Sequence, residues 1–474
     1  MSDWNRRGLL ALGGATIVAG GARAQDSAVG LAPELGDRLG QMMRDAKVPA
    51  AGVAVVHEGA VVAAQGLGLA SLPFQVPADE RTLFHLGSVS KQLTASLVLE
   101  LVEAGAIALD DPVGRHARGL PEAFASAPIR TLLSHTSGIP DYEGLEGFEA
   151  DRAIDRETFL AGAAALPLNF RPGEAWAYSN TGYVLLGYLL ADVTGQSYRD
   201  RMSERLLGRV GLRDARVDEA RAIIPGRAEP YVLEDGVAQH AVGMDSDFSG
   251  WPDGGVLMSA RDAARWEQAL QGAAVPSRFT VEALTTPALM ASGRSAAYGA
   301  GWFTDRLNGH AVQYHSGSVP GFLTYAWRAP RTRTAVTVMV NIESGPAAAF
   351  MREACLMLAE SVAPGSTPLS LAPAEDDAPE VTAAALTMLA RADRALDPAQ
   401  FTPEISALIG GQAGGSVLPP NLGSDLAGVG WALVERHEEP GGQVRRYRLT
   451  RGGRMRHISI AYAPDGRIYR VRTL

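Results

Sequence analysis

The tetrad Ser88-Val89-Ser90-Lys91 combines a hydroxyl nucleophile with a side chain that can act as its base. It opens an apolar run, residues 92–105, whose hydrophobic side chains recur at helical spacing. Ser88 is therefore expected at or near a helix N-cap, with Lys91 one turn further on and on the same side. A serine hydroxyl is a poor nucleophile until a base removes its proton. A lysine in a desolvated pocket can lose its charge and become that base, which arginine cannot do.

Lysine is rare in this chain, which makes Lys91 informative. The sequence contains 41 arginines and only two lysines, Lys47 and Lys91. Arginine is used almost everywhere that a cation is wanted, yet a lysine stands three residues after Ser88. An ordinary N-cap followed by a surface lysine would give the same tetrad, because Ser-x-x-Lys is a short motif. The motifs further along the chain favour the catalytic interpretation.

Two further motifs lie beside predicted helices and strands. Tyr178-Ser179-Asn180 precedes an apolar run at helical spacing, so it is expected on a loop before a helix. His315-Ser316-Gly317 begins on the last residue of a predicted strand over 311–315. Another histidine, His135, lies in the turn-rich loop 132–141, and no second histidine is spaced to chelate a metal with it. We expect a structural histidine there, and the proposed chemistry requires neither a metal nor a cofactor.

In this order, Ser88-x-x-Lys91, Tyr178-Ser179-Asn180 and His315-Ser316-Gly317 resemble the serine β-lactamase and penicillin-binding-protein-like hydrolases. The resemblance is strongest to the branch with class C β-lactamases, D-alanyl-D-alanine carboxypeptidases and related esterases. It covers residues 35–360, and the loop 135–140 and Gly254-Gly255 are also similar to that family.

The resemblance implies an acyl-enzyme mechanism. Ser88 would attack a carbonyl carbon, while Lys91 and Tyr178 would move its proton during acylation and deacylation. Tyr178 can act as a base only if nearby cations lower its pKa, which is about 10 for a free tyrosine. Lys91 or His315 is expected to supply that field.

The remaining residues of the motifs would bind the substrate. Asn180 would hold the lysine or the acyl amide. The backbone N–H groups of Ser88 and Ser318 would stabilise the oxyanion. The substrate would contact the residues of the strand-end motif, His315, Ser316 and Gly317.

Departures from the family pattern restrict the class of substrate that we expect. Asn169 has Ala165 where class A β-lactamases place a glutamate, and no Ser-Asp-Asn occurs, so a class A enzyme is not expected. His315 stands where many β-lactamases carry a lysine, and a histidine is only partly charged near neutral pH. We therefore expect a serine hydrolase acting on a D-amino-acid peptide, an amide or a small ester. The alternatives are a β-lactamase of class C type and a non-catalytic relative that binds wall peptides or serves as a scaffold.

Composition restricts the partners. The formal net charge is −9, and it is about −11 without residues 1–24. This acidity argues against nucleic acid and against general attraction to anionic membranes, so the expected partner is a small molecule or a peptide. The single cysteine, Cys355, cannot form an internal disulfide, and it is expected to be a small core residue.

Residues 1–24 have the features of an export signal. Arg6-Arg7 precede an apolar, glycine-rich run, and Ala22-Arg23-Ala24 has the form of a cleavage site. The paired arginines are similar to a twin-arginine signal, and a general secretory signal is the alternative. The apolar run is too short to be a good transmembrane helix. We expect an exported protein, periplasmic or extracellular, without stable membrane insertion after signal cleavage.

The element pattern predicts an α+β fold, in which an antiparallel β-sheet is flanked by helices and joined by a helical region. Helices are predicted over 34–46 and 347–360, and the hydrolase domain would span 25–362. The predicted strands cover residues 51–56, 61–66, 298–303, 311–315, 321–327 and 334–341.

A small C-terminal α+β domain is predicted over 381–474. Four prolines and the run Glu375-Asp376-Asp377 mark a linker over 363–380. An alanine-rich helix over 381–396 and four alternating segments, ending at residue 473, predict a four-stranded meander. Nine arginines lie between Arg445 and Arg472. They would form either a solvated outer face of the sheet or a contact surface for an anionic cell-envelope polymer.

Overall fold

The structure is a computed structural model. It describes residues 30–144, 155–219, 221–242, 250–391, 396–409, 417–419, 422–451 and 454–474. The predicted export signal, residues 1–24, lies outside the described residues. Among the helices that are described, none has both the length and the apolar character needed to cross a membrane.

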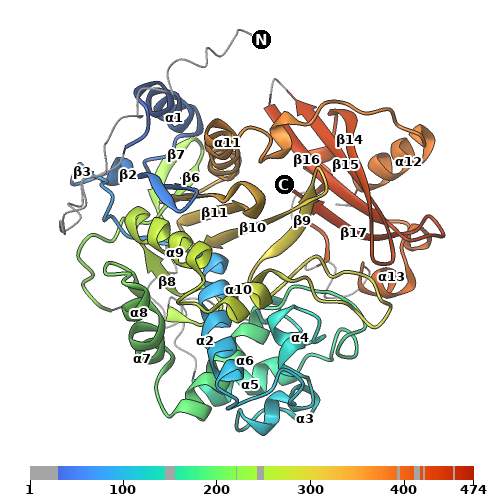
Figure 1. Cartoon of the computed structure of the whole chain (residues 1–474), viewed down its shortest axis with the longest axis horizontal. Helices are drawn as coiled ribbons and strands as arrows, with labels where there is room; N and C mark the ends of the chain where they lie inside the picture. Colours follow the sequence, from blue (N-terminus) through green and yellow to red (C-terminus); the bar gives the residue numbers. More distant parts are fainter. Residues whose placement is uncertain are drawn as a thin grey trace.

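A seven-stranded antiparallel sheet forms the centre of the larger part of the chain (Figure 1). Its third and fourth strands, β1 and β12, pair over residues 51–57 and 334–340, with Val53 opposite Val338. The start and the end of the predicted hydrolase region therefore meet in the middle of one sheet. The strands in spatial order are β3 (Val76–Pro77), β2 (Ala60–Ser71), β1 (Ala50–His57), β12 (Thr334–Val340), β11 (Phe322–Ala329), β10 (His310–Val319) and β9 (Phe303–Leu307).

Helices cover both faces of this sheet, so alternate residues of β1 enter two different apolar clusters. Val53 and Val55 join the cluster that contains Leu39 of α1 (Pro33–Ala46) and Phe350 of α11 (Gly345–Val362). Ala54 and Val56 join the cluster that contains residues of α9 (Ala260–Gly272) and of the helical region. That region includes α2 (Lys91–Glu103), α4 (Ile129–Leu133), α6 (Asn180–Thr194) and α10 (Arg278–Thr285). The predicted α+β architecture is confirmed.

Cys355 lies in the first of these clusters, on α11. Its side chain is fully buried, and its thiol donates a hydrogen bond to the carbonyl oxygen of Val336 at 3.3 Å. Burial raises the pKa of Cys355 well above its ordinary value. It is a core residue, as the sequence predicted.

A small three-stranded sheet supports the start of α2. It consists of β4 (Phe84–His85), β8 (Val256–Met258) and β5 (Arg216–Val217), in that order. Both β4 and β8 are largely buried, and β4 leads directly into the turn that carries Ser88. The position of Ser88 therefore depends on this sheet.

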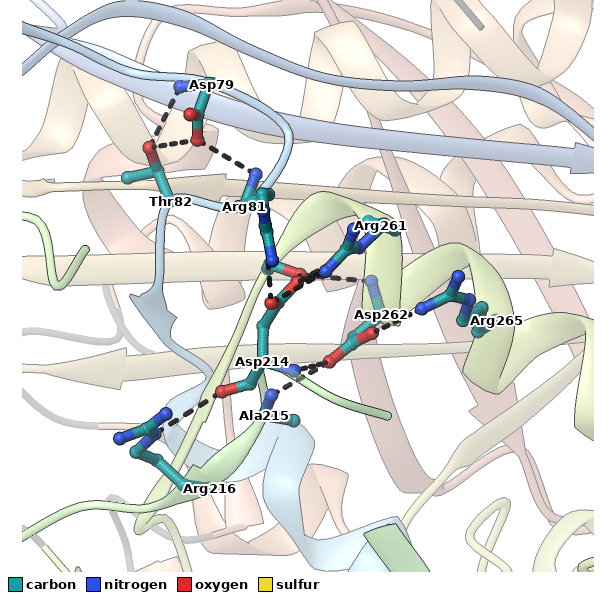
Figure 2. A network of polar contacts seen from close by, with 10 residues as sticks. Asp79, Arg81, Thr82, Asp214, Ala215, Arg216, Arg261, Asp262 and Arg265 are labelled. Atoms are coloured by element: carbon teal, nitrogen blue, oxygen red, sulfur yellow. Dashed lines mark hydrogen bonds and ion pairs between the residues drawn. The ribbon is translucent and has the colours of Figure 1, made fainter. Parts of the chain in front are cut away.

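Two carboxylates connect the small sheet to α9 (Figure 2). Asp214, just before β5, accepts a hydrogen bond from Arg261 at 2.8 Å and forms an ion pair with Arg81 at 3.8 Å. Asp262, in the first turn of α9, accepts the backbone N–H groups of Asp214 at 2.6 Å and Ala215 at 2.8 Å. These bonds hold β5 and the loop before β4 against one helix end.

One strand prediction was wrong. Residues 298–302 form a turn, and strand β9 begins only at Phe303. Gly301 has φ +91° and lies so close to α2 that a Cβ there would come within 2.5 Å of the Gln92 backbone nitrogen. This close approach excludes an extended strand at these residues and brings Tyr298 into the interior.

A separate domain follows α11, and its four-stranded meander is confirmed (Figure 1). Its helices are α12 (Pro379–Leu389), α13 (Pro403–Ile409) and α15 (Leu422–Leu426), which pack on one face of the sheet. The helix predicted over 381–396 corresponds to α12, which ends at Leu389. Leu389 is also the last side chain of α12 among the buried residues of this domain's apolar cluster. The strands are β14 (Gly430–Glu439), β15 (Gly442–Arg451), β16 (Arg454–Tyr462) and β17 (Ile468–Thr473).

The acidic run of the predicted linker is attached to this sheet. Asp376 and Asp377 accept hydrogen bonds from Arg445 at 3.0 and 2.6 Å, and Asp377 also pairs with Arg436. On the other side of the sheet Arg446 and other arginines are buried against the hydrolase region. Arg445, Arg446 and Arg472 are thus buried, whereas Arg451 and Arg454 are exposed, so a contact of this domain with an envelope polymer stays a prediction.

Replacement of Arg328 by methionine is expected to destabilise the fold by about 3–5 kcal/mol, because it leaves Glu267 as a buried charge without its partner. Arg328 (β11) donates to both carboxylate oxygens of Glu267 (α9), at 2.9 and 2.8 Å, and both side chains are buried. Denaturant unfolding measures the loss. The control is Arg331→Met, an exposed site in the following turn, which should change stability by less than about 0.5 kcal/mol. Equal stability of the two variants would show that the buried Arg328–Glu267 pair does not stabilise the fold.

Candidate active site

Ser88 lies in the 3-10 turn η2 (Gly87–Ser90), which continues directly into α2. The N-cap of α2 is Ser90, so Ser88 precedes the α-helix by one short turn. Ser88 is half-buried, whereas Lys91 is completely buried. The two side chains lie on the same side, with Lys91 Nζ 3.1 Å from Ser88 Oγ. Ser88 is therefore partly exposed to solvent while its neighbouring lysine is not.

Lys91 is surrounded by three acceptors. Besides Ser88, its Nζ contacts Asn180 Oδ1 and the carbonyl oxygen of Asp253, both at 2.7 Å. Burial lowers the pKa of Lys91 to about 8, although the carboxylates of Asp253, Asp141 and Glu143 raise it. A neutral Lys91 can take the proton of Ser88, so this geometry is that of a nucleophile beside its base.

The loop before α6 supplies Tyr178 and Asn180. Ser179 caps the helix by accepting the N–H of Gly182 at 3.2 Å, which fixes the direction of Asn180. Asn180 donates its backbone N–H to Asp141 at 2.9 Å and its side-chain amide to Glu143 at 3.1 Å. The ring of Tyr178 lies 4.9 Å from Lys91 Nζ. The structure thus brings Ser88, Lys91, Tyr178 and Asn180 together.

The pKa of Tyr178 is shifted in the direction opposite to the expected one. Burial raises it well above its ordinary value, the Ser88 side chain lowers it, and the carboxylates of Asp141 and Asp253 raise it again. The expected lowering by cations was wrong because burial, together with two carboxylates, raises the pKa instead. A neutral phenol can donate or relay a proton, which leaves Lys91 as the base of this pair.

His135 holds the Tyr178 loop in place. Its Nδ1 accepts the N–H of Ser179 at 3.1 Å, and its carbonyl oxygen accepts the N–H of Ala177 at 3.0 Å. Its ring lies 4.2 Å from that of Tyr178, and its backbone has φ +58°. Burial lowers the pKa of His135 well below its ordinary value, so the ring is neutral. His135 is a structural histidine, although it bonds to the Tyr-Ser-Asn stretch rather than within its own loop.

His315 is neutral and uses both ring nitrogens. Its Nδ1 lies 2.6 Å from the carbonyl oxygen of Ser316, so Nδ1 carries the proton. Its Nε2 then accepts the hydroxyl of Tyr298 at 2.9 Å. Burial, and the charge of Lys91, lower the pKa of His315 to about 3. His315 therefore offers no charge to a substrate, contrary to the electrostatic role expected from the sequence.

The strand that carries Ser316 and Gly317 has one open edge. Strand β9 pairs with β10 only as far as Tyr314, so no strand among the described residues pairs with residues 315–319 on that side. Gly317, in this part of the strand, lies against η2 and the residue before it at very short range. A Cβ at Gly317 would lie 1.9 Å from the Leu86 carbonyl oxygen, and a Cβ at Gly87 would lie 2.7 Å from the backbone nitrogen of Ser318. Both positions require glycine, and the backbone of Ser318 is thereby brought beside Ser88.

Several residues of the site were missed in the sequence. Tyr298 lies in the segment wrongly predicted as a strand. Asp141 ends the loop that follows His135, and Asp253 directly precedes Gly254-Gly255, so both stand next to motifs that the sequence did reveal. Tyr142 donates a hydrogen bond to Asp253 at 2.8 Å and holds that carboxylate near Lys91. Within the described ranges, no group of three or more histidine, cysteine, aspartate or glutamate side chains is arranged to hold a metal ion.

Comparison with known proteins identifies the family. A family model described as Beta-lactamase matches residues 35–358. Penicillin-binding protein 4* of Bacillus subtilis is 31% identical over 314 residues, which cover 60% of this chain and 68% of that protein. D-aminopeptidase of Gluconobacter oxydans is 28% identical over 312 residues, which cover 62% of this chain and only 56% of that protein.

The fold likeness extends over the C-terminal domain. The octameric penicillin-binding protein homologue from Pyrococcus abyssi superposes with a TM-score of 0.58 over 91% of this chain and 96% of that chain, at 19% sequence identity. The α+β fold is thus of the β-lactamase and transpeptidase type. The chain belongs to the β-lactamase family, a family of serine hydrolases, as the three motifs indicated.

The value of kcat/KM is expected to rise with pH through an apparent pKa near 8, because Lys91 is the active base only when it is neutral. Lys91→Arg keeps the charge but removes the base, and it should lower kcat/KM roughly 10²- to 10⁴-fold. The control is Lys47→Arg, since Lys47 is exposed and contacts only the carbonyl oxygen of Gly236 among the hydrogen bonds resolved for it. A pH-independent rate between about pH 6 and 9, or a fully active Lys91→Arg variant, would contradict this role.

Proposed function

We propose that this chain is an exported serine amidase or peptidase that forms an acyl-enzyme at Ser88. One observation carries the proposal: the buried Lys91, with its pKa lowered to about 8, contacts the half-buried Ser88 hydroxyl at 3.1 Å. The relatives support a hydrolytic function, because they include a protein named D-aminopeptidase and one named as a penicillin-binding protein.

Each step uses a residue of the site. Ser88 Oγ attacks the carbonyl carbon while its proton passes to Lys91 Nζ, and the N–H groups of Ser88 and Ser318 stabilise the oxyanion. Collapse of the tetrahedral intermediate breaks the bond to the leaving group, which receives the proton from Lys91 through Tyr178. Water then attacks the acyl-enzyme with Lys91 again as the base, and Ser88 regains its proton as the acid product leaves.

The charges around Lys91 favour a substrate that carries a free amino group. Asp141, Glu143 and Asp253 surround Lys91 and Asn180, and burial raises the pKa of Glu143 to about 7, so Glu143 is ionised above that pH. Once Lys91 is neutral, these carboxylates lack a cation at close range, and a substrate ammonium group would offset them. His315 is neutral and does not supply the cation that would hold a substrate carboxylate. A D-amino-acid amide or peptide with a free amino terminus therefore fits better than a β-lactam.

Ser88→Ala is expected to abolish turnover without unfolding the protein, because it removes only the nucleophile. Intact-mass spectrometry in excess benzylpenicillin tests the same residue directly. A persistent adduct that disappears in Ser88→Ala would show acylation without efficient deacylation, as in a penicillin-binding peptidase. Hydrolysed penicillin without an adduct would instead establish the class C β-lactamase alternative, and full activity of Ser88→Ala would disprove the mechanism.

Glu143→Gln is expected to raise KM for a D-amino-acid amide about tenfold, because one charge–charge contact near the surface is worth about 1 kcal/mol or slightly more. The N-acetylated form of the same amide has no charge, so its KM should not change. Steady-state kinetics at pH 7.5 on both substrates measure the difference. The matched control is Glu234→Gln, an exposed glutamate on β6 (Tyr231–Glu234). An equal effect on both substrates would show that Glu143 only supports Asn180.

A further inference from the structure

The segment that leads into Tyr178 is enclosed by the C-terminal domain. Residues 173–178 run from a turn to the Tyr-Ser-Asn motif without belonging to a helix or strand. Few backbone hydrogen bonds connect these residues to the rest of the hydrolase region. Gly173 donates its N–H to Thr136 at 2.7 Å, and Ala177 donates to His135 at 3.0 Å. The side chains of Ala175, Trp176 and Ala177 are nevertheless all buried.

On one side of this segment lies the helical part of the C-terminal domain. Ala175 and Ala177 form an apolar cluster with Leu408 of α13 and with Val417. All four side chains are buried. These two alanines therefore have no room for movement toward α13, since a close-packed contact resists displacement in that direction.

On the other side lies the last strand, β17. The guanidinium carbon of Arg472 lies 3.9 Å from the centroid of the Trp176 ring and 5.2 Å from that of Phe303. Arg472 is only 8% exposed. In the described part of the chain it forms no ion pair with a carboxylate, and its Nε and Nη2 atoms make no hydrogen bond. Its principal contact is thus the face of Trp176, and a cation–π contact is strongest when it is desolvated as here.

Buried ion pairs keep β17 and its neighbours in this position. Arg446 of β15, which is 1% exposed, pairs with Asp305 of β9 at 2.7 Å and donates to the Arg306 carbonyl oxygen at 2.8 Å. Arg470 of β17 donates to the Ser295 carbonyl oxygen at 3.0 Å and pairs with Glu439 at 2.6 Å. The domain is therefore fixed to the strand and turn that border the site.

Trp176 connects Arg472 to the catalytic residues. Its ring lies 6.4 Å from the ring of Tyr178, 6.2 Å from that of Tyr298 and 6.1 Å from that of His135. Tyr298 is the donor to His315, and His135 packs on Tyr178. A shift of Trp176 would consequently move the aromatic cluster against which Tyr178 is packed.

We propose that the C-terminal domain is a structural part of the catalytic site, in which α13 and Arg472 hold the segment 175–178 between them. Arg472 is the positioning residue for Tyr178 and acts through Trp176. This inference rests on the proposed function, because it assumes that Tyr178 takes part in proton transfer. The hydrolase region contains every reactive group, yet it depends on residues more than 200 positions further along the chain for their alignment.

The test is a double-mutant cycle between Arg472 and Tyr178 in the full-length protein, measured with a D-amino-acid p-nitroanilide. Arg472→Met should lower kcat roughly 10- to 100-fold with little change in KM, since a misplaced proton-transfer group slows chemistry without weakening binding. In the Tyr178→Phe background the same substitution should have almost no further effect, because the group it positions is already absent. Arg472→Lys keeps a cation over Trp176 and should retain most of the wild-type kcat.

The matched control is Arg456→Met, because Arg456 belongs to the same sheet but pairs with Asp425 instead of contacting the hydrolase region in the bonds the structure resolves. It should leave kcat unchanged. If Arg472→Met is too unstable to measure, Trp176→Phe serves in its place, since it weakens the cation–π contact and leaves β17 intact. An equal loss of kcat in both Tyr178 backgrounds, or wild-type kcat for Arg472→Met, would overturn the inference.

Labelling of Ser88 by a fluorophosphonate probe in the same preparations distinguishes failure of the Arg472 positioning role from failure of the proposed function. Loss of labelling in Ser88→Ala together with an unaffected Arg472→Met variant would disprove only the positioning role. Turnover that persists in Ser88→Ala would disprove the proposed function itself.

Discussion

The burial of Lys91 is the constraint on which the rest of this site depends. An amine without solvent contact favours its neutral form, and only that form can accept the proton of Ser88. Asp141, Glu143 and Asp253 oppose this effect, so the pKa settles at about 8 rather than lower. Burial also raises the pKa of Asp141 and Asp253 above their ordinary values. The pKa of Lys91 is thus set by two opposing effects, desolvation and the charge of the nearby acidic groups.

Four separate parts of the chain must meet for that balance to exist. The turn before α2 supplies the nucleophile and the base, and the loop before α6 supplies Tyr178 and Asn180. The turn before β8 provides the Asp253 carbonyl oxygen, and the open edge of β10 provides the backbone that faces Ser88. The central sheet, the small sheet and α9 hold these parts together, and the C-terminal domain borders the same aromatic cluster.

The sequence predicted much of this arrangement, because its signals are local. Ser88 and Lys91 are one helical turn apart, and Tyr178 and Asn180 stand directly before an apolar run, so neighbours along the chain are neighbours in space. The strands of the C-terminal meander were also predicted, since each alternates apolar and polar residues between recognisable turns. Tyr298 was misplaced because the close approach of Gly301 to α2 depends on a helix some 200 residues earlier, which no local pattern contains.

By itself the sequence determined the reactive groups, their order along the chain and the α+β class, because these follow from residue type and short-range periodicity. Only the tertiary structure decided which state those groups adopt. Tyr178 is a neutral phenol and His315 a neutral imidazole because burial disfavours charge, and burial is a property of the assembled fold. Likewise, nothing in the spacing of Arg472 places it on Trp176. That contact arises because the final strand of a second domain packs against the first and places the guanidinium group over a desolvated aromatic face.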